Sequence, residues 1–247
     1  MNRKERRKKN KKIKLLTILE IILIIIIVIT SVYIFFWIKD NNKNKNLLKT
    51  IEETITIDES NNEINYNIDF KKLREINPHT VGWIKVDGTN INYSVVQAQD
   101  NEYYLNHTFD NSYNSAGWIF MDCANKLDGT DKNIVIYGHN RKDGSMFGSL
   151  NNILNEDWIN KNKEVLFFTE QETSKYEIFS VYEIKNEDYY IKTQFRDEEF
   201  SEFIKTIKDR SIYNLNVDVK ETDSILTLST CGSNSKYRLV LHAKRII

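Results

Sequence analysis

Residues 81–96 read Val-Gly-Trp-Ile-Lys-Val-Asp-Gly-Thr-Asn-Ile-Asn-Tyr-Ser-Val-Val. Within this stretch, the runs Val81–Val86 and Asn90–Val96 flank the dipeptide Asp87-Gly88. β-Branched and aromatic residues favour strands, and Asp-Gly between two such runs is typical of a tight hairpin turn. The stretch therefore predicts a β-hairpin, and it opens a region whose pattern stays strand-like to the C-terminus.

Six further strand-like runs follow the hairpin, with mostly short links between them. They are Gly117–Met121, Asn133–Tyr137, Glu164–Thr169, Ser174–Ile184, Ser224–Thr230 and Tyr237–Ile246. Helical pieces are predicted at about 100–106, 145–162 and 197–209. Eight short strands with short links favour a closed barrel over an array of βαβ units. The sequence thus predicts a mainly β protein with added helices, built on a closed eight-stranded β-barrel.

The residues before the hairpin predict a short helix and a stalk. A helix is expected over Phe70–Ile76, because Asp69 can cap its start and Asn77-Pro78 ends it. Residues 39–64 are polar and are predicted to form a partly helical stalk. Its apolar residues at helical spacing are Leu47, Leu48, Ile51 and Ile55.

Residues 15–38 form an apolar stretch with a single charge, at Glu20. Twenty-four helical residues are long enough to cross the roughly 30 Å hydrocarbon layer of a membrane. A cleaved signal peptide is the alternative, but the run is too long and no small-x-small site follows it. The stretch therefore predicts a retained transmembrane helix.

Charge is distributed unevenly along a chain whose formal net charge is zero. Residues 1–14 carry nine Lys/Arg and one Glu, which predicts a basic tail on the cytoplasmic side of the membrane. Such a tail could bind nucleic acid, but the apolar span directly after it favours membrane insertion. Residues 65–247 are then expected outside the cell as one domain with its own core.

The chain has two cysteines, Cys123 and Cys231, and each needs its own explanation. Cys231 closes a strand-like run and precedes the loop 232–235, a typical position for a reactive side chain. A buried cysteine at a strand end is the alternative. Cys123 has no nearby cation in the sequence, which favours a small buried hydrophobe.

A cysteine nucleophile needs a base and benefits from a fixed cation. Arg238 opens the strand after Cys231, so antiparallel pairing would bring the two residues together at one rim of the barrel. Among the four histidines, His139 directly follows the strand that ends in Tyr137-Gly138 and is also at a rim. His242 lies inside the last strand, roughly 13 Å from Arg238 along it. Position alone therefore leaves His139 as one candidate base among the four histidines.

Several motifs together resemble the sortase family. Thr227–Cys231 reads TLSTC and precedes Arg238, as in the sortase signature TLxTC with its downstream arginine. Tyr137–Asn140 resembles the histidine segment of the family. The stretches that look specifically like class B are 136–148, 81–89 and 100–105. The resemblance covers most of residues 65–247, although Gly232 stands where several class B members have an acidic residue, and the loop to Arg238 is short.

The resemblance implies an eight-stranded sortase barrel with Cys231, His139 and Arg238 as catalytic residues. It implies that the enzyme cleaves the C-terminal sorting signal of a surface protein after threonine. The threonyl carbonyl is then joined, through a thioester with the enzyme, to an amine of peptidoglycan. An Asn-Pro-x-Thr type of motif on surface proteins is the expected substrate. No metal or cofactor is expected. The positions that match sorting-signal contacts in class B members are Asn101, Leu105, Tyr190, Ile191 and Ser229.

Three alternatives stay open at the level of the sequence. A cysteine peptidase or wall hydrolase would pass the same thioester to water. A pilin-polymerising sortase would use a lysine of another pilin as the acceptor. A membrane-tethered binding module without activity is disfavoured, because the cysteine, histidine and arginine of the signature are all present.

Overall fold

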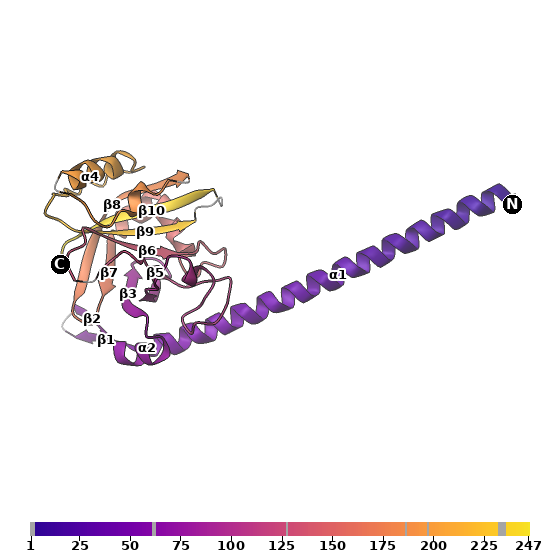
Figure 1. The fold of residues 1–247 in the computed structure, drawn as a ribbon, viewed down its shortest axis with the longest axis horizontal. Helices are drawn as coiled ribbons and strands as arrows, with labels where there is room; N and C mark the ends of the chain where they lie inside the picture. The colour runs from indigo at the N-terminus through magenta and orange to yellow at the C-terminus, as the bar shows by residue number, and fades with distance from the viewer. Residues whose placement is uncertain (1–2, 61–62, 127, 186, 197, 232–235) are drawn as a thin grey trace. The chain divides into compact units, whose positions relative to one another are not determined.

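The computed structural model describes residues 3–60, 63–126, 128–185, 187–196, 198–231 and 236–247. The chain forms two compact units, Met1–Leu48 and Lys49–Ile247. Helix α1 (Arg3–Glu52) makes up the first unit (Figure 1). Its last residues, from Lys49 to Glu52, belong to the second unit.

The middle of helix α1, residues 15–38, is apolar. Its segment Ile13–Glu52 is long and apolar enough to cross a membrane, with a mean hydropathy of 3.0 in its most apolar window. The large apolar side chains from Ile13 to Ile38 are exposed in the structure. Lipid would remove this surface from water, so the exposure agrees with the predicted span.

The second unit is a closed β-barrel with helices on its outside (Figure 1). Its eight strands are β3 (Thr80–Val86), β4 (Asn92–Val96), β5 (Phe120–Met121), β6 (Asn133–Gly138), β7 (Glu164–Phe168), β8 (Thr173–Lys185), β9 (Ile225–Cys231) and β10 (Tyr237–Arg245). They follow one another around the barrel in the order β10-β8-β7-β3-β4-β5-β6-β9. The predicted closed eight-stranded barrel is therefore confirmed.

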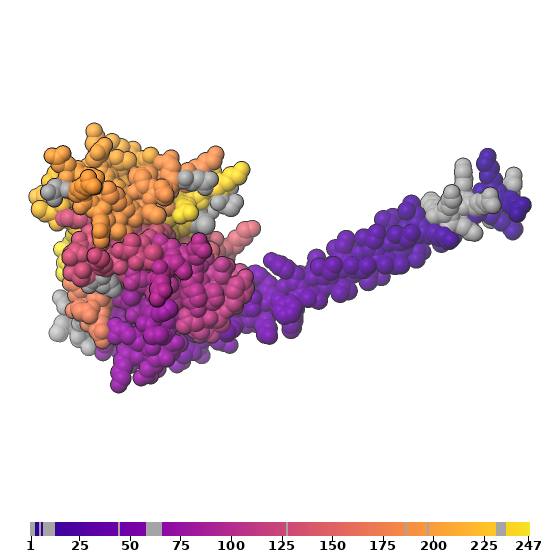
Figure 2. Space-filling model, in the orientation of Figure 1, coloured from indigo at the N-terminus to yellow at the C-terminus, as the bar shows by residue number. Residues whose placement is uncertain are grey.

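Short helices fill the connections between the strands. They are η1 (Tyr103–Leu105), η2 (Gly148–Leu154), α3 (Glu156–Lys161), η3 (Tyr189–Ile191) and α4 (Glu199–Asp209). Four buried side chains on α4, Phe200, Phe203, Ile204 and Ile207, form the apolar face expected from the sequence. In Figure 2, this orange part of the chain covers one end of the barrel unit. Helix η3 was not predicted, because three residues are too few to show a helical period.

The predicted hairpin and the predicted short helix are both present. Gly88 has a φ of +71°, the left-handed conformation that a hairpin turn requires. Helix α2 covers Phe70–Ile76, and the Asp69 side chain accepts a hydrogen bond of 2.9 Å from the backbone of Lys72. This cap satisfies one of the free N–H groups at the helix start.

Residues 39–64 match the predicted, partly helical stalk only as far as Glu52. After α1 ends at Glu52, an antiparallel hairpin forms from β1 (Ile55–Ser60) and β2 (Glu63–Ile68). Leu47, Leu48 and Ile51 lie in α1 as their helical spacing predicted, whereas from Ile55 the period-two alternation of isoleucine with polar residues favours a strand. Ile51 is 1% exposed, so the end of α1 also packs in the second unit.

Candidate functional site

At one mouth of the barrel, strands β6 and β9 end and strand β10 begins. Strands β6 and β9 are parallel, and Gly138 pairs with Thr230 near their ends. His139 follows Gly138 directly, and Cys231 is the last residue of β9. Strand β10 is antiparallel to β9, with Arg238 opposite Cys231. The register therefore places His139, Cys231 and Arg238 at the same rim, on the three neighbouring strands labelled in Figure 1.

A hydrogen bond to a backbone carbonyl of η1 orients the His139 ring. Its Nε2 lies 2.7 Å from the carbonyl oxygen of Leu105. A carbonyl can only accept, so Nε2 carries a proton in this arrangement. In the neutral ring, Nδ1 is then the nitrogen that can accept a proton.

Gly117 lies against this histidine and has no room for a side chain. Its φ is +59°, and a Cβ built on it would lie 2.8 Å from Cδ2 of His139 and 2.6 Å from the Tyr104 carbonyl. Backbone atoms cannot move away as a flexible side chain can. The glycine therefore lets the chain pass close behind the imidazole.

Replacing Gly117 with alanine should both strain the backbone and displace His139. We expect a loss of roughly 1–3 kcal/mol in the free energy of unfolding, together with at least a tenfold fall in kcat. Thermal unfolding and peptide-cleavage kinetics measure the two effects separately. Gly129→Ala is the control, because its φ of +79° carries the same strain but a Cβ there meets nothing within 4 Å. Equal losses of kcat in the two variants would contradict the positioning role.

A cleft of about 350 Å³ opens at this mouth of the barrel. It is lined by Asn101, Leu105, Phe120, Tyr137, Gly138, His139, Ile191, Ser229, Thr230 and Arg238. The floor is mostly apolar, and the polar groups converge at the strand ends, as in a typical peptide or ligand site. Phe120, Tyr137 and Thr230 were missed in the sequence, because a strand residue shows which face it presents only once the register is known.

Four of the five predicted substrate contacts line the cleft, and the fifth lies behind it. Tyr190 is fully buried, and its hydroxyl lies 2.9 Å from Oγ of Ser229. It therefore reaches the cleft only through Ser229 and through its neighbour Ile191. Asn133 donates hydrogen bonds to the carbonyls of Tyr190 and Lys192, which fixes the backbone on both sides of Ile191.

His242 is inside the barrel wall and away from the cleft. It is fully buried, with Nε2 2.8 Å from the Tyr182 hydroxyl and Nδ1 2.8 Å from Oγ1 of Thr227. Thr227 donates its own proton to Asn133 Oδ1 at 2.6 Å, so it accepts from Nδ1–H of His242. Burial lowers the pKa of His242 to about 3. The residue is a neutral part of a buried polar network.

His242 should make the stability of the protein depend on pH. The unfolded chain takes up a proton near pH 6.5, while the folded chain resists it down to about pH 3. The neutral ring therefore stabilises the fold above pH 6.5, and this contribution falls as the pH drops through that window. His242→Gln should lower the Tm at pH 7 by several degrees and make the Tm fall less steeply between pH 7 and 4.5. Thermal unfolding across this range is the measurement, and parallel curves would contradict the assignment.

Cys123 is exposed, so the prediction of a buried hydrophobe was wrong. It follows β5 in a turn, and its backbone N–H donates a 2.8 Å hydrogen bond to Asn101 Oδ1, which leaves the side chain outside. The thiol is free. Partial burial and the neighbouring Asp122 carboxylate raise its pKa, which disfavours the thiolate.

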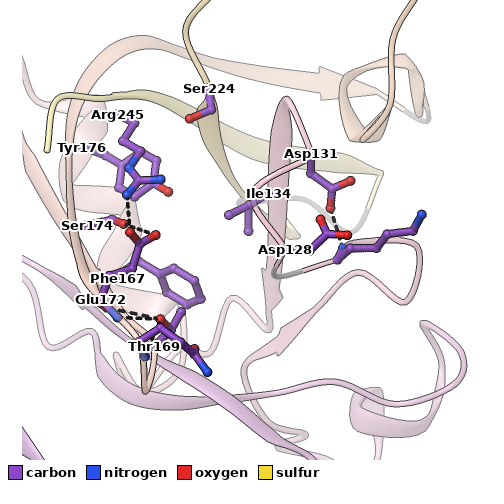
Figure 3. Close-up of a pocket in the computed structure, with 13 residues that line it drawn as sticks. Asp128, Asp131, Ile134, Phe167, Thr169, Glu172, Ser174, Tyr176, Ser224 and Arg245 are labelled. Atoms are coloured by element: carbon purple, nitrogen blue, oxygen red, sulfur yellow. Dashed lines mark hydrogen bonds and ion pairs between the residues drawn. The ribbon is translucent and has the colours of Figure 1, made fainter.

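A second hollow lies at the opposite mouth of the barrel (Figure 3). Asp131, before β6, and Arg245, at the end of β10, line it from strand ends far from the cleft. Arg245 pairs with Glu172 at 2.7 Å, one of the contacts drawn there. No cysteine or histidine is among the described residues that line it. Within the described ranges, no three His, Cys, Asp or Glu side chains are grouped to hold a metal.

The comparisons with known proteins agree with the fold. The model of the sortase domain matches residues 84–246. The chain belongs to the sortase family, the cysteine transpeptidases of the cell wall. It is 35% identical over 213 residues to a sortase B of Listeria monocytogenes, covering 84% of this chain and 87% of that protein.

Solved structures of sortase B superpose on this chain. The sortase B of Bacillus anthracis has a TM-score of 0.74 at 38% identity, covering 85% of this chain and 99% of its own. The sortase B of Clostridium perfringens has a TM-score of 0.70 at 40% identity, covering 72% and 100%. The class B resemblance drawn from the sequence is therefore confirmed. Gly232 and the rest of the loop 232–235, where the sequence departs from that class, lie outside the described residues.

Proposed function

We propose that this protein is a membrane-anchored sortase that attaches surface proteins to the cell wall. Its substrate would carry a C-terminal sorting signal, of an Asn-Pro-x-Thr type, which is cut after the threonine. The acceptor would be an amine of a peptidoglycan precursor or cross-bridge. The observation that carries the proposal is the convergence of His139, Cys231 and Arg238 on one rim, beside a peptide-sized cleft.

In the first half-reaction, the Cys231 thiolate attacks the threonyl carbonyl carbon and forms a tetrahedral oxyanion. Arg238 donates hydrogen bonds to this oxyanion, which it can do at any physiological pH because its guanidinium stays charged. Imidazolium His139 gives the Nδ1 proton to the leaving amine, while Nε2–H stays bonded to the Leu105 carbonyl. The C–N bond breaks and a thioester with Cys231 remains.

The second half-reaction runs the same steps backwards with another amine. The acceptor amine attacks the thioester carbonyl, and His139 takes its proton on Nδ1. The C–S bond breaks, an amide forms, and the thiolate returns. The proton that His139 gives to the leaving amine in the first half-reaction is replaced by the proton of the acceptor amine in the second, so the proposed cycle needs no cofactor.

Two solved relatives support the assignment of substrate and acceptor. One is described as a Staphylococcus aureus sortase B–substrate complex. Another is a sortase B complexed with triglycine, whose terminal amine is of the kind that a transpeptidase acceptor offers. Both structures are 37% identical to this chain and cover 72% of it.

The N-terminal unit supports a location at the membrane. We assign residues 1–14 to a cytoplasmic tail and 15–38 to a single transmembrane anchor, with the barrel outside the cell. The excess of Lys and Arg before the span supports this direction. In that position the enzyme meets exported proteins and wall precursors at the membrane surface.

Product analysis with and without an amine tests the proposal. A fragment of residues 40–247 would be incubated with a labelled Asn-Pro-x-Thr peptide, with or without triglycine. We expect an amide-linked product when triglycine is present, detected by mass spectrometry, at the expense of the hydrolysed peptide. Hydrolysis alone at all triglycine concentrations would identify a peptidase, and no cleavage of any sorting peptide would refute the proposal.

A further inference from the structure

A buried carboxylate outside the cleft binds two of the residues that line it. Asp122 is 4% exposed and follows β5. Its Oδ2 accepts hydrogen bonds from Asn101 Nδ2 at 2.9 Å and from the Tyr137 hydroxyl at 2.6 Å. Both donors line the cleft, while Asp122 itself does not.

The backbone around Asp122 holds this carboxylate rigidly. Oδ1 accepts from the N–H of Ala124 at 2.8 Å, and the N–H of Asp122 donates to the Val135 carbonyl at 2.9 Å. Gln97 reaches the Asp122 carbonyl from β4's end at 2.8 Å. A charged acceptor with three donors makes strong hydrogen bonds, so its position can determine those of Asn101 and Tyr137.

The carboxylate also determines which hydrogen-bonding groups the cleft can offer. Asn101 turns its amide nitrogen towards Asp122 and its oxygen towards the N–H of Cys123, so its second amide hydrogen remains for a substrate. The Tyr137 hydroxyl donates its only proton to Asp122, so it can offer a substrate only a hydrogen-bond acceptor. One donor and one acceptor side by side match a peptide or carboxamide group.

We infer that Asp122 is a positioning residue for the sorting peptide: it sets the donor of Asn101 and the acceptor of Tyr137 that face an amide of the substrate. This inference rests on the proposed function, because it assumes that a peptide occupies the cleft. Asp122 acts through its two partners and does not touch the reacting atoms.

Asp122→Asn changes one atom and cannot keep all these bonds. If the new amide oxygen faces Asn101 and Tyr137, the new NH₂ group meets the N–H of Ala124. If the amide is turned, Asn101 must turn as well, and its NH₂ group then meets the N–H of Cys123. The negative charge is lost in both cases, which weakens the bonds that remain.

A second buried aspartate in the same β5–β6 connection provides the matched control. Asp131 is 5% exposed and accepts hydrogen bonds from Asn125 and Lys126, at the hollow of Figure 3. Its Oδ1 has no partner among the described residues, so an amide there loses little. Asp131→Asn repeats the chemical change without touching the cleft.

We expect Asp122→Asn to raise the KM for the sorting peptide about 10-fold, since weakened charge-assisted bonds cost about that factor, with kcat within about threefold of wild type. Asp131→Asn should leave both constants near wild type. The rate at which iodoacetamide modifies Cys231, followed by mass spectrometry of its tryptic peptide, should be the same in all three proteins. An unchanged KM, or an equal change in the Asp131 variant, would overturn the inference.

A double-mutant cycle tests whether Asp122 acts through Asn101 or through the stability of the whole domain. Combined with Asn101→Ala, the Asp122 change should add less to KM than it does alone, because the partner through which it acts is gone. Full additivity would also overturn the inference. A wild-type domain that cleaves no sorting peptide would refute the proposed function and the inference with it, whereas an active wild type with an unaffected Asp122→Asn refutes the inference alone.

Discussion

Cys231→Ala is expected to lower kcat/KM for sorting peptides by about 10⁴-fold or more. The substitution removes the enzyme atom that, in the proposed reaction, forms a covalent bond with the substrate. The barrel should fold normally, because the change is small and lies at the end of a strand. Cleavage of a labelled peptide, with trapping of the thioester by hydroxylamine, measures the effect.

Cys123→Ala is the matched control for this experiment. Its thiol is exposed, and partial burial and Asp122 raise its pKa, which disfavours the thiolate that a nucleophile needs. Only its backbone N–H contacts Asn101, and alanine keeps that group. Activity should stay within about twofold of wild type. A dead Cys123→Ala variant with intact folding would reverse the assignment of the two cysteines.

Arg238→Lys should reduce kcat/KM by about 10²–10³, the usual cost of losing one oxyanion donor. The variant keeps the positive charge, so it separates charge from geometry. A guanidinium presents a planar set of donors, whereas an ammonium is a point charge on a flexible stem. Because Arg238 is exposed at the start of β10, its replacement should leave the Tm nearly unchanged.

Arg245→Lys tests the same chemical change at the other end of the same strand. Arg245 pairs with Glu172 at the far hollow of Figure 3 and cannot reach the cleft. We expect its kcat/KM to stay within about twofold of wild type. Near-normal activity of Arg238→Lys would mean that only charge matters at that rim, and the oxyanion role would have to be abandoned.

The proposed roles share one structural dependence, on the helix η1. The Leu105 carbonyl fixes the proton on Nε2 of His139, and the Leu105 side chain lines the cleft. Binding of a peptide against Leu105 is therefore linked directly to the orientation of the histidine. Gly117 holds the chain close to both residues, which explains why its replacement should affect the chemistry as well as stability.

The sequence alone determined the barrel and its three rim residues. Period-two patterns mark the strands. A residue at the end of a strand, or directly after it, lies at a rim of the barrel. Cys231, His139 and Arg238 could therefore be placed at a rim before the register was known. The sortase motifs then indicated which histidine belongs with the cysteine. The alternation of apolar and polar residues along one strand involves only neighbours in the chain, so it can be recognised from the sequence.

Only the tertiary structure decided what surrounds these residues. Tyr190 and Ile191 are neighbours in sequence, yet one is buried against Ser229 and the other lines the cleft. Cys123 lies outside because its backbone is held by Asn101, 22 residues earlier. Asp122 acts through its hydrogen bonds to Asn101 and Tyr137, and His242 is neutral because the closed barrel buries it. Such contacts join residues far apart in the chain, so they exist only after the barrel closes and fixes the register of every strand.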